Sequence, residues 1–563
     1  MTDLVERARS WMEADPDPET GADLQRVIDS GDEAALESRM NTVLSFGTAG
    51  IRGEVGSGPG RMNRAVVIRT TFGLASYLGD VDRPVVVGFD ARPTSRQFAE
   101  DTAGVLAAAG ISVVYFPEVT PTPLVAFTAK HVGAAAAVVV TASHNPPADN
   151  GYKVYGSDAS QIVSPVDEEI QAAIDRAPAA RDIPRVERAF SEKSGLVSAV
   201  DPDIVDRYWD EVSSTRSRSK GSAARIVYTP IHGVGRDVFL DLMSRAGHQG
   251  CVPVPEQADP DGTFPTVEFP NPEEPGALDL ALGLAGEIDA DLVLANDPDA
   301  DRLAVVLPTD SGFRPLSGNE IGVLLGDYVL RHDTDPATAI VANSIVSSPL
   351  LQRIARSYGA THTATLTGFK WIVRAGLSLE GDGLGRFVFG YEEALGYTIG
   401  STVRDKDGMS AGLIFTDLFA DLADEGRTVL DRLHELWSEH GLWVSAQNSI
   451  VRAGPDGVES LTRSVETLAD NPPSRIGNHP VTAVTDYRRG AESRPAWLGE
   501  QPLVELELGE RGRILVRPSG TEPKLKIYVD LSGPVGADPD ATQLALLDEA
   551  RILGDALEGS ISG

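Results

Sequence analysis

Two short segments of the chain carry side chains suited to phosphoryl chemistry. Residues 141–146 read TASHNP and follow an apolar run, and residues 297–302 read DPDADR and follow a second apolar run much further along. A serine in a loop after a strand could carry a phosphoryl group, and a cluster of carboxylates could hold a divalent cation. Together they indicate a metal-assisted enzyme that works through phosphorylated Ser143.

The acidic segment has the spacing expected of a metal site. Asp297, Asp299 and Asp301 alternate, so in an extended segment their carboxylates project to one side and can converge on one ion. All-oxygen ligation favours Mg²⁺, which accepts a few carboxylates together with phosphate oxygens. An EF-hand calcium loop starting at Asp297 would need Gly and Glu where the chain has Arg302 and Pro308. A solvated turn is the alternative, but adjacent carboxylates repel one another, and a cation relieves that repulsion.

The serine segment admits two interpretations, a loop that carries the reactive Ser143 or an ordinary turn. It lacks the Gly-x-Ser-x-Gly elbow of hydrolases. We expect the side chain of His144 to diverge from that of Ser143, as neighbours do in an extended segment. Thr141 and Ser143 could also form an ordinary turn with their hydroxyls bonded to the backbone.

Several cations and polar loops could serve the same site. Lys153 lies in a segment that we expect to return as a strand toward the serine loop; a lowered pKa would let it act as an acid or base, or it could be solvated. Arg52 lies in a glycine-rich segment suited to phosphate or to a plain surface loop. Lys406 and Lys370 are further cations in loops after strands, the latter in residues 367–370, which read TGFK.

Two later loops could bind the rest of a phosphorylated substrate. Glu392 and Glu393 could accept hydrogen bonds from sugar hydroxyls, or they could be solvated. A second loop gathers a guanidinium, two hydroxyls and an accessible backbone N–H, which would form a phosphate cradle or, alternatively, a polar hairpin. Its residues are Arg517, Ser519, Gly520 and Thr521.

The elements that must position these residues follow an α/β pattern from Pro84 onward. Short Val-rich runs alternate with helical periodicity, and the order recurs three times. The copies end in strands at 135–140, 291–295 and 386–389, and each is followed by one of the polar loops. Open α/β sheets bind ligands beyond the carboxyl ends of their strands, so three such loops could share one site.

After Gly441 the pattern changes to a smaller α+β domain. Two strands within 513–531 flank the Arg517 loop, and apolar and polar residues alternate strictly from 524 to 531, which predicts one buried and one solvated face. The fold class predicted is α/β: three sequential similar α/β domains with mixed sheets around a central cleft, plus this C-terminal domain. We place the domains at residues 1–200, 201–312, 313–440 and 441–563.

Composition narrows the function and the setting. The 563 residues exceed one hydrophobic core, and a formal net charge of −34 disfavours nucleic acid and anionic membranes as partners. Cys251 is the only cysteine, which excludes an intrachain disulfide framework. The first twenty residues lack the apolar core of a signal peptide, and we find no uncharged stretch long enough to span a bilayer. We expect a cytoplasmic protein, monomeric or homodimeric, whose N-terminal helix at 4–12 packs on the first domain or mediates association.

Four loops together resemble those of the α-D-phosphohexomutase superfamily. TASHNP, DPDADR, GYEEALG at 390–396 and RPSGTEP at 517–523 occur in the order and at the approximate spacing of that family. The resemblance implies four domains around a cleft. It also implies that Ser143 is carried as phosphoserine and ligates Mg²⁺ together with the three aspartates.

The resemblance also implies roles for the other residues. Arg52 and Lys153 would assist proton transfer and charge stabilisation, and His144 and Lys406 would lie at the reacting group. Arg302 would lie by the metal loop and Glu392 would bind sugar hydroxyls; with Thr367, Gly368, Lys370 and Glu393 they form the predicted substrate-binding set. The nontransferring phosphate would bind to Arg517, Ser519, Gly520 and Thr521.

The implied reaction interconverts hexose 1-phosphate and 6-phosphate, with glucose 1,6-bisphosphate or mannose 1,6-bisphosphate as intermediate and activator. Many relatives have Ser where this chain has Ala394 in the sugar loop, which leaves the sugar open. A phosphopentomutase acting on ribose or deoxyribose phosphates is the alternative enzyme. A catalytically inactive sugar-phosphate sensor is a weaker alternative, because a binding module has no need of Ser143, the aspartates and Lys153. A plain phosphatase is another weaker alternative, which the release of free phosphate would distinguish.

Overall fold

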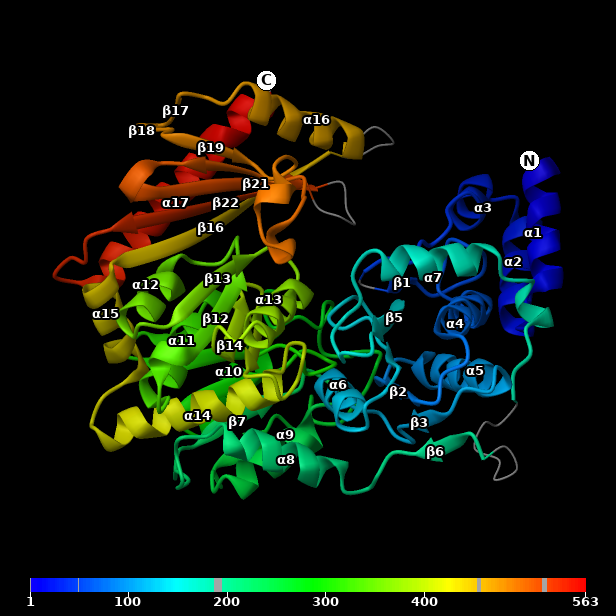
Figure 1. Ribbon diagram of the computed structural model, residues 1–563, viewed down its shortest axis with the longest axis horizontal. Coiled ribbons are helices and arrows are strands. Elements are labelled where there is room, and N and C mark those ends of the chain that lie inside the picture. Colours follow the sequence, from blue (N-terminus) through cyan, green and yellow to red (C-terminus); the bar gives the residue numbers. More distant parts are fainter. Residues whose placement is uncertain (1, 49, 187–194, 453–456, 519–523, 563) are drawn as a thin grey trace. The chain divides into compact units, whose positions relative to one another are not determined.

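Each of four successive parts of the chain forms its own sheet (Figure 1). The computed structural model describes residues 2–48, 50–186, 195–452, 457–518 and 524–562. By their internal contacts these parts form two units. The first comprises Met1–Pro315 with Ser401–Ile414, and the second comprises Leu316–Gly400 with Phe415–Gly563.

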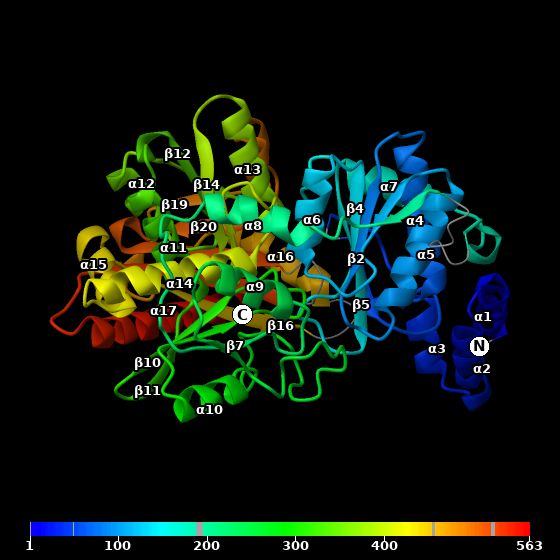
Figure 2. The ribbon, with the colours of Figure 1, turned by 90° about the horizontal axis from the view of Figure 1, so that it is seen from below.

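The first sheet has the order β1-β5-β4-β2-β3-β6. Its strands are β1 (Ile51–Glu54), β2 (Val85–Phe89), β3 (Val113–Tyr115), β4 (Ala136–Val140), β5 (Asp149–Tyr155) and β6 (Val197–Ala199). Strands β2, β3, β4 and β6 run parallel, whereas β5 is antiparallel to both β4 and β1. Helices α4 (Arg64–Leu78), α5 (Ser95–Ala108), α6 (Thr122–His131) and α7 (Val166–Asp175) accompany it. Helices α5 and α6 cover opposite faces (Figure 2).

The second sheet has the order β11-β10-β9-β7-β8. Its strands are β7 (Ile226–Thr229), β8 (Cys251–Pro253), β9 (Leu292–Ala295), β10 (Ala304–Thr309) and β11 (Gly312–Pro315). Its helices are α8 (Ile204–Ser214), α9 (Arg236–Arg245) and α10 (Asp279–Glu287). Strands β7, β8 and β9 run parallel, and β10 returns antiparallel to β9.

The third sheet has the order β13-β12-β14-β15. Its strands are β12 (Ala339–Ser344), β13 (Thr361–Thr365), β14 (Arg386–Glu392) and β15 (Gly396–Ile399). The helices of this part are α11 (Gly318–His332), α12 (Leu350–Ser357), α13 (Phe369–Gly381), α14 (Gly408–Asp424) and α15 (Val429–His440). Strand β15 is antiparallel to β14, and the others are parallel.

The three sheets share one four-stranded arrangement, which confirms the predicted repeat. In each, three parallel strands are joined by an antiparallel strand that follows the last of them: β5-β4-β2-β3, β10-β9-β7-β8 and β15-β14-β12-β13. The connection from the last parallel strand to the antiparallel one carries Ser143 in the first sheet, the three aspartates in the second and Glu393 in the third. A common topology therefore delivers each predicted loop.

Three N-terminal helices pack together and against the first domain. They are α1 (Thr2–Ala14), α2 (Pro18–Ser30) and α3 (Glu33–Met40). They share a core that includes Leu4, Leu24 and Leu36, while Trp11 also contacts a cluster of the first domain. Packing on the first domain, one of the two alternatives for this segment, is therefore observed, and association stays a prediction.

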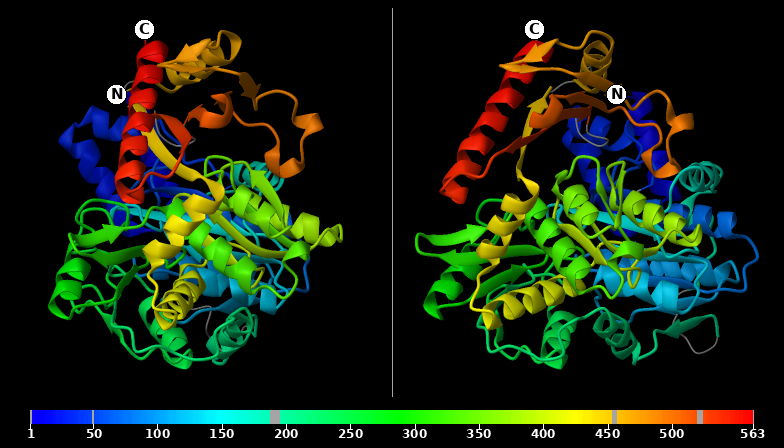
Figure 3. Two further views of the ribbon diagram at one scale, coloured as in Figure 1. Left: turned by 90° about the vertical axis from the view of Figure 1, so that its left-hand side faces the viewer. Right: turned by 60° about the vertical axis from the view of Figure 1, so that its left-hand side comes forward.

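The fourth sheet is antiparallel, in the order β16-β22-β21-β20-β19. Its strands are β16 (Leu442–Val451), β19 (Ala483–Asp486), β20 (Val504–Glu507), β21 (Gly512–Pro518) and β22 (Lys524–Gly533), with a separate ribbon of β17 (Arg475–Ile476) and β18 (His479–Pro480). Helix α17 (Pro539–Ser562) lies along β16 and β22, as Figure 3 shows, and α16 (Gly457–Asp470) packs on several of the strands. Three α/β domains and a smaller C-terminal domain thus form the chain.

We predicted that one face of β22 is solvated, and the prediction is wrong for two residues of that face. Leu525, Ile527 and Leu531 are buried as expected, but so are Tyr528 and Asp530. The Tyr528 ring packs in a cluster with Ile345 and Val346 of the third domain. The Asp530 carboxylate accepts hydrogen bonds from Arg513 Nε at 2.9 Å and Ser445 Oγ at 2.6 Å. Side chains on both faces of this part of β22 are therefore buried, and the alternation of apolar and polar residues did not predict burial of the second face.

No helix among the described residues combines the length and the apolarity needed to cross a bilayer.

Helix α13 offers a test of its packing on β14. A Cβ added at Gly376 would lie 2.4 Å from Cγ of the Phe387 ring, whereas one added at Gly381 of the same helix meets nothing within 4 Å. We expect Gly376→Ala to lower the free energy of unfolding by about 1–3 kcal/mol through overpacking. Gly381→Ala should be neutral or slightly stabilising. Urea unfolding of both variants checks this, and equal effects would contradict the packing described.

Candidate active site

The serine loop joins β4 to β5 and holds Ser143 in an unusual backbone conformation. Ser143 has φ 51°, in the left-handed region that costs a residue with a Cβ about 1–2 kcal/mol. Its N–H donates to Thr141 Oγ1 at 2.8 Å, which is one local bond that stabilises this conformation. The residue is buried, at the carboxyl end of β4.

The side chains of Ser143 and His144 do not diverge, so that expectation is wrong. Ser143 Oγ lies 3.1 Å from His144 Nδ1. The left-handed turn at Ser143 breaks the extended geometry on which the expectation rested. Burial lowers the pKa of His144 well below its usual value, and the nearby guanidinium of Arg302 lowers it further. His144 is therefore a neutral imidazole near pH 7, in contact with the serine hydroxyl.

The three aspartates converge through a turn and not through an extended segment. Ala300 has φ 60°, and its N–H donates to the carbonyl of Asp297 at 2.9 Å. The carboxylates of Asp297, Asp299 and Asp301 are buried, and one oxygen of each lies within 4.8 Å of the others. The predicted convergence is present, although the backbone reaches it differently.

Hydrogen bonds join the serine loop of the first domain to the aspartate loop of the second. Ser143 Oγ donates to Asp297 Oδ2 at 2.7 Å. Thr122 Oγ1, at the start of α6, donates to Asp299 Oδ2 at 2.7 Å. The predicted phosphoryl carrier and the predicted metal ligands are therefore in direct contact.

Two lysines offset the charge of the aspartates. Lys153 Nζ, on β5, lies 2.7 Å from Asp299 Oδ2 and 3.1 Å from Asp301 Oδ2. Lys406 Nζ lies 3.2 Å from Asp301 Oδ2. Both lysines are buried. The pairing of β5 with β4 places Lys153 opposite Val139, close to the serine loop, as the sequence predicted.

The local charges set the protonation of these groups. Burial raises the pKa of Asp297 well above its usual range, and the charges of Asp299 and Asp301 raise it further. Burial acts in the same direction on Asp299, but Lys153 outweighs it and holds the pKa of Asp299 below its usual range. The pKa of Lys153 shifts in the direction opposite to our expectation. Burial alone would lower its pKa, yet the carboxylates of Asp299 and Asp301 raise it.

The aspartate cluster fits a hard divalent cation. Asp299 Oδ1 and Asp301 Oδ1 are buried and have no hydrogen-bond partner in the structure. An unpartnered buried carboxylate oxygen is destabilising, and a metal ion would satisfy both. The ligand atoms are all oxygens, and the Ser143 hydroxyl lies beside them, which suits Mg²⁺ more than a softer metal.

Residues 401–414 group with the first unit and position Lys406. Asp405 Oδ2 accepts hydrogen bonds from Tyr155 OH at 2.6 Å and Gln161 Nε2 at 2.8 Å. Gly408 follows closely, and a Cβ there would lie 2.0 Å from the carbonyl oxygen of Arg302. The segment is thus anchored on both sides of Lys406.

Two arginines predicted for the site lie at its edge. Arg302 Nη2 lies 3.4 Å from His144 Nε2, and its Nη1 lies 3.4 Å from Glu273 Oε2. The Arg52 side chain is exposed and donates to Asn145 Oδ1 at 2.9 Å. Arg52 therefore contacts the serine loop through Asn145.

Sequence reasoning missed Thr122, which contacts the aspartate loop, and Arg92, which contacts the serine loop. Arg92 follows β2, and β2 is the neighbour of β4 in the sheet. Carboxyl ends of adjacent parallel strands lie side by side, so a cation after β2 was a signal that could have been used. Thr122 carried no comparable signal, because its partner Asp299 belongs to a different domain.

The second unit carries the predicted sugar and phosphate residues. Glu393 Oε2 accepts hydrogen bonds from Ser344 Oγ at 2.9 Å and Ser347 Oγ at 3.1 Å. Thr367 Oγ1 accepts from Gln501 Nε2 of the C-terminal domain at 3.0 Å. The remaining predicted residues of this unit are Gly368 with φ 110° before α13, Lys370 with Nζ 5.9 Å from the centre of the Trp371 ring, Glu392 at the end of β14, and Arg517 with Nη2 3.3 Å from Tyr528 OH. Ser519, Gly520 and Thr521 lie outside the described residues.

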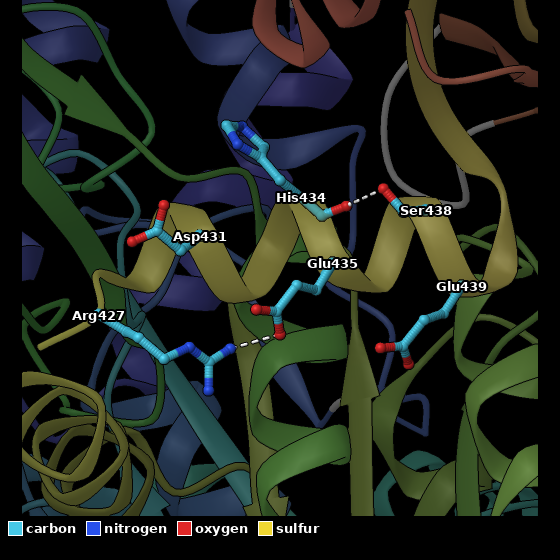
Figure 4. Close-up of a pocket in the computed structure, with 6 residues that line it drawn as sticks. All are labelled: Arg427, Asp431, His434, Glu435, Ser438 and Glu439. Carbon is cyan, nitrogen blue, oxygen red and sulfur yellow. Dashed lines mark hydrogen bonds and ion pairs between the residues drawn. The ribbon is translucent and has the colours of Figure 1, made fainter. Parts of the chain in front are cut away.

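A separate hollow along α15 contains none of the predicted site residues (Figure 4). Within its lining, Arg427 donates to Glu435. His434 also pairs with Asp540 at 3.0 Å. Nothing in its lining competes with the Ser143 centre as a catalytic site.

Comparisons with known proteins find similar domains along most of this chain. Models of phosphoglucomutase/phosphomannomutase alpha/beta/alpha domains I, II and III match residues 43–181, 206–311 and 317–440, and the model of the C-terminal domain matches 481–533. A probable phosphomannomutase of Haemophilus influenzae is 40% identical, over 87% of this chain and 96% of that protein. A phosphopentomutase of Mus musculus is 35% identical, over 95% and 92%. A phosphoglucomutase of Staphylococcus haemolyticus is 34% identical, over 90% and 93%.

The fold is also shared with solved structures. The crystal structure of a putative phosphomannomutase from Thermus thermophilus superposes with a TM-score of 0.67. The two chains are 24% identical, and the match covers 91% of this chain and 99% of that one.

The cation site can be tested by thermal unfolding. We expect MgCl₂ to raise the Tm of the protein, because a ligand that binds the folded state stabilises it. Asp299→Asn removes a buried carboxylate charge and should weaken Mg²⁺ binding at least about tenfold, so most of the Tm shift is lost. Asp261→Asn, in an exposed loop of the same domain, is the matched control and should keep the shift. An unchanged Mg²⁺ response in Asp299→Asn would contradict this assignment.

Proposed function

Because the chain belongs to the phosphoglucomutase/phosphomannomutase family of isomerases, we propose that it interconverts the 1- and 6-phosphates of glucose or mannose. The observation that carries the proposal is the contact of Ser143 Oγ with Asp297 Oδ2 at 2.7 Å, inside a cluster of three carboxylates and two lysines. A serine so placed suits a phosphoryl carrier and has no role in mere sugar binding.

The reaction consists of two transfers through one serine. Phosphorylated Ser143 gives its phosphoryl group to the free hydroxyl of the sugar phosphate. The hydroxyl loses its proton as the new P–O bond forms, the released Ser143 Oγ takes up a proton, and the product is a 1,6-bisphosphate. The bisphosphate then presents its other phosphate, whose phosphoryl group passes to Ser143 Oγ, and the leaving sugar oxygen takes up a proton. The serine is phosphorylated again at the end, so a trace of glucose 1,6-bisphosphate or mannose 1,6-bisphosphate would serve as activator.

The residues around Ser143 supply alignment and positive charge. Phosphoryl transfer gains most of its catalysis from these two contributions. Asp297, Asp299 and Asp301 would hold Mg²⁺ together with the serine phosphate, and the bound ion would withdraw negative charge from the transferring group. Lys153 and Lys406 add fixed positive charge. The raised pKa of Lys153 keeps this lysine protonated near pH 7, which suits it to stabilise charge on the transferring group.

Residues of the second unit would bind the rest of the substrate. We assign the sugar hydroxyls to Glu392 and Glu393, with Thr367, Gly368 and Lys370 beside them, and the nontransferring phosphate to Arg517 with Ser519, Gly520 and Thr521. The Glu393 carboxylate is oriented by two serine hydroxyls, which supports its use as a fixed acceptor. Arg52, His144 and Arg302 would contact the transferring phosphate or its loop. We also propose the domain boundaries 1–200, 201–312, 313–440 and 441–563.

A pentose phosphate is the second candidate substrate. Phosphopentomutases of mouse and human match 95% of this chain at 35% and 34% identity. Ala394 in the sugar loop also removes one hydroxyl that could contact a hexose. The reaction type is the same for both substrates.

A substrate panel and a serine variant test the proposal. We expect product from glucose or mannose 1-phosphate in coupled assays with Mg²⁺ and a trace of glucose 1,6-bisphosphate, and less from ribose 1-phosphate. Ser143→Ala removes the phosphoryl carrier and should lower kcat at least about 10³-fold. Mass spectrometry should find phosphate on Ser143 in the wild-type protein.

Each alternative gives a different result. A higher rate on ribose 1-phosphate would favour the pentomutase. Release of free phosphate without isomer would indicate a phosphatase. No turnover and no phosphate on Ser143 in any preparation would indicate an inactive sensor.

A further inference from the structure

We propose that Arg92 is a positioning residue that fixes the backbone of Ser143 for phosphoryl transfer. The proposal rests on the proposed function, because it concerns the same serine. Arg92 follows β2 and is 3% exposed, and it lies too deep among protein groups to bind a substrate directly.

The guanidinium of Arg92 uses all five of its N–H donors on protein groups. Nη2 donates to the carbonyls of Ser143 at 2.6 Å and Asn145 at 2.7 Å. Nη1 donates to the carbonyls of Pro146 at 2.7 Å and Asp149 at 2.8 Å. Nε donates to Asp90 Oδ2 at 3.2 Å. One planar group thus gathers three carbonyls of the serine loop and the carbonyl of Asp149, the first residue of β5, around itself.

This arrangement accounts for the strained conformation of Ser143. A left-handed non-glycine residue persists only where its surroundings fix it more strongly than the strain opposes it. The carbonyl held at 2.6 Å belongs to Ser143 itself, so the bond fixes the orientation of the peptide that follows Ser143. That orientation, together with the bond from the Ser143 N–H to Thr141 Oγ1, directs the hydroxyl toward Asp297.

Arg92 also contacts the domain that supplies the aspartates. Its guanidinium lies over the ring of Phe264, 5.1 Å from the ring centre. The backbone of Gly262 approaches so closely that a Cβ there would lie 2.3 Å from Arg92 Cα. Arg92 therefore holds the serine loop and touches the second domain, which is where Asp297 lies.

A lysine cannot replace Arg92 in this role. Lys has three donors on one atom and lacks the planar fork that spans four carbonyls. Arg92→Lys keeps the charge but would leave at least one buried carbonyl without a donor. Misplacement of a reacting group by about 1 Å can lower a rate about 10²-fold.

The test separates positioning from mere stabilisation. We expect Arg92→Lys to lower kcat about 30- to 100-fold while KM for the sugar phosphate stays within about threefold. The single-turnover rate at which labelled bisphosphate phosphorylates Ser143 should fall by the same factor. Arg64→Lys is the matched control, because Arg64 makes a bidentate pair with Asp101 at 2.7 and 2.9 Å in the same domain. It should lower Tm without changing kcat at a temperature where the protein is folded.

Asp90→Asn is a second, milder variant should Arg92→Lys fail to fold. It weakens the acceptor of Arg92 Nε, and we expect a kcat about 5- to 10-fold lower with unchanged KM. Wild-type kcat in the folded variants, or a rise in KM at unchanged kcat, would overturn the inference and leave the proposed function standing. If the wild-type protein itself turns over no sugar phosphate, the proposed function fails and this inference fails with it.

Discussion

Three carboxylates buried within 4.8 Å of one another impose the main electrostatic constraint on this protein. Like charges in a low-dielectric interior repel strongly, and each unpaired one would destabilise the fold by several kcal/mol. The compensating lysines come from distant parts of the sequence, Lys153 from β5 and Lys406 from the segment after β15. The first domain, the second domain and residues 401–414 thus form one unit around the aspartate loop.

The repeated topology explains how one fold supplies different chemistry three times. Each α/β domain ends its parallel strands with a connection to an antiparallel strand, and that connection lies outside the paired registers of the strands. Its residues can therefore vary without loss of the sheet, which is why loops at strand ends carry function. One connection holds the serine, the next the aspartates and the third Glu393.

The sequence predicted the elements and the loops well, because strands and motifs leave local patterns. It failed where a residue's state depends on contacts across domains. The raised pKa of Lys153 follows from Asp299 and Asp301, which no pattern around Lys153 reveals. The burial of Tyr528 follows from contact with Ile345 of the third domain. The left-handed Ser143 was missed because alternation assumes an extended backbone, and the sequence shows no glycine there to signal a turn.

In the proposed mechanism the reacting centre and the residues assigned to the sugar belong to different domains, so reaction type and sugar choice are different questions. Ser143, the aspartates and the lysines contact only the transferring phosphoryl group in the proposed mechanism, which is the same for hexose and pentose phosphates. The sugar itself would be read by Glu392, Glu393 and their neighbours in another domain. On this proposal, a change at a position such as Ala394 would alter the sugar bound without disturbing the charge balance around Ser143. Relatives that are 34–40% identical to this chain are named for different sugars, as we expect if the sugar and the phosphoryl group are bound by different domains.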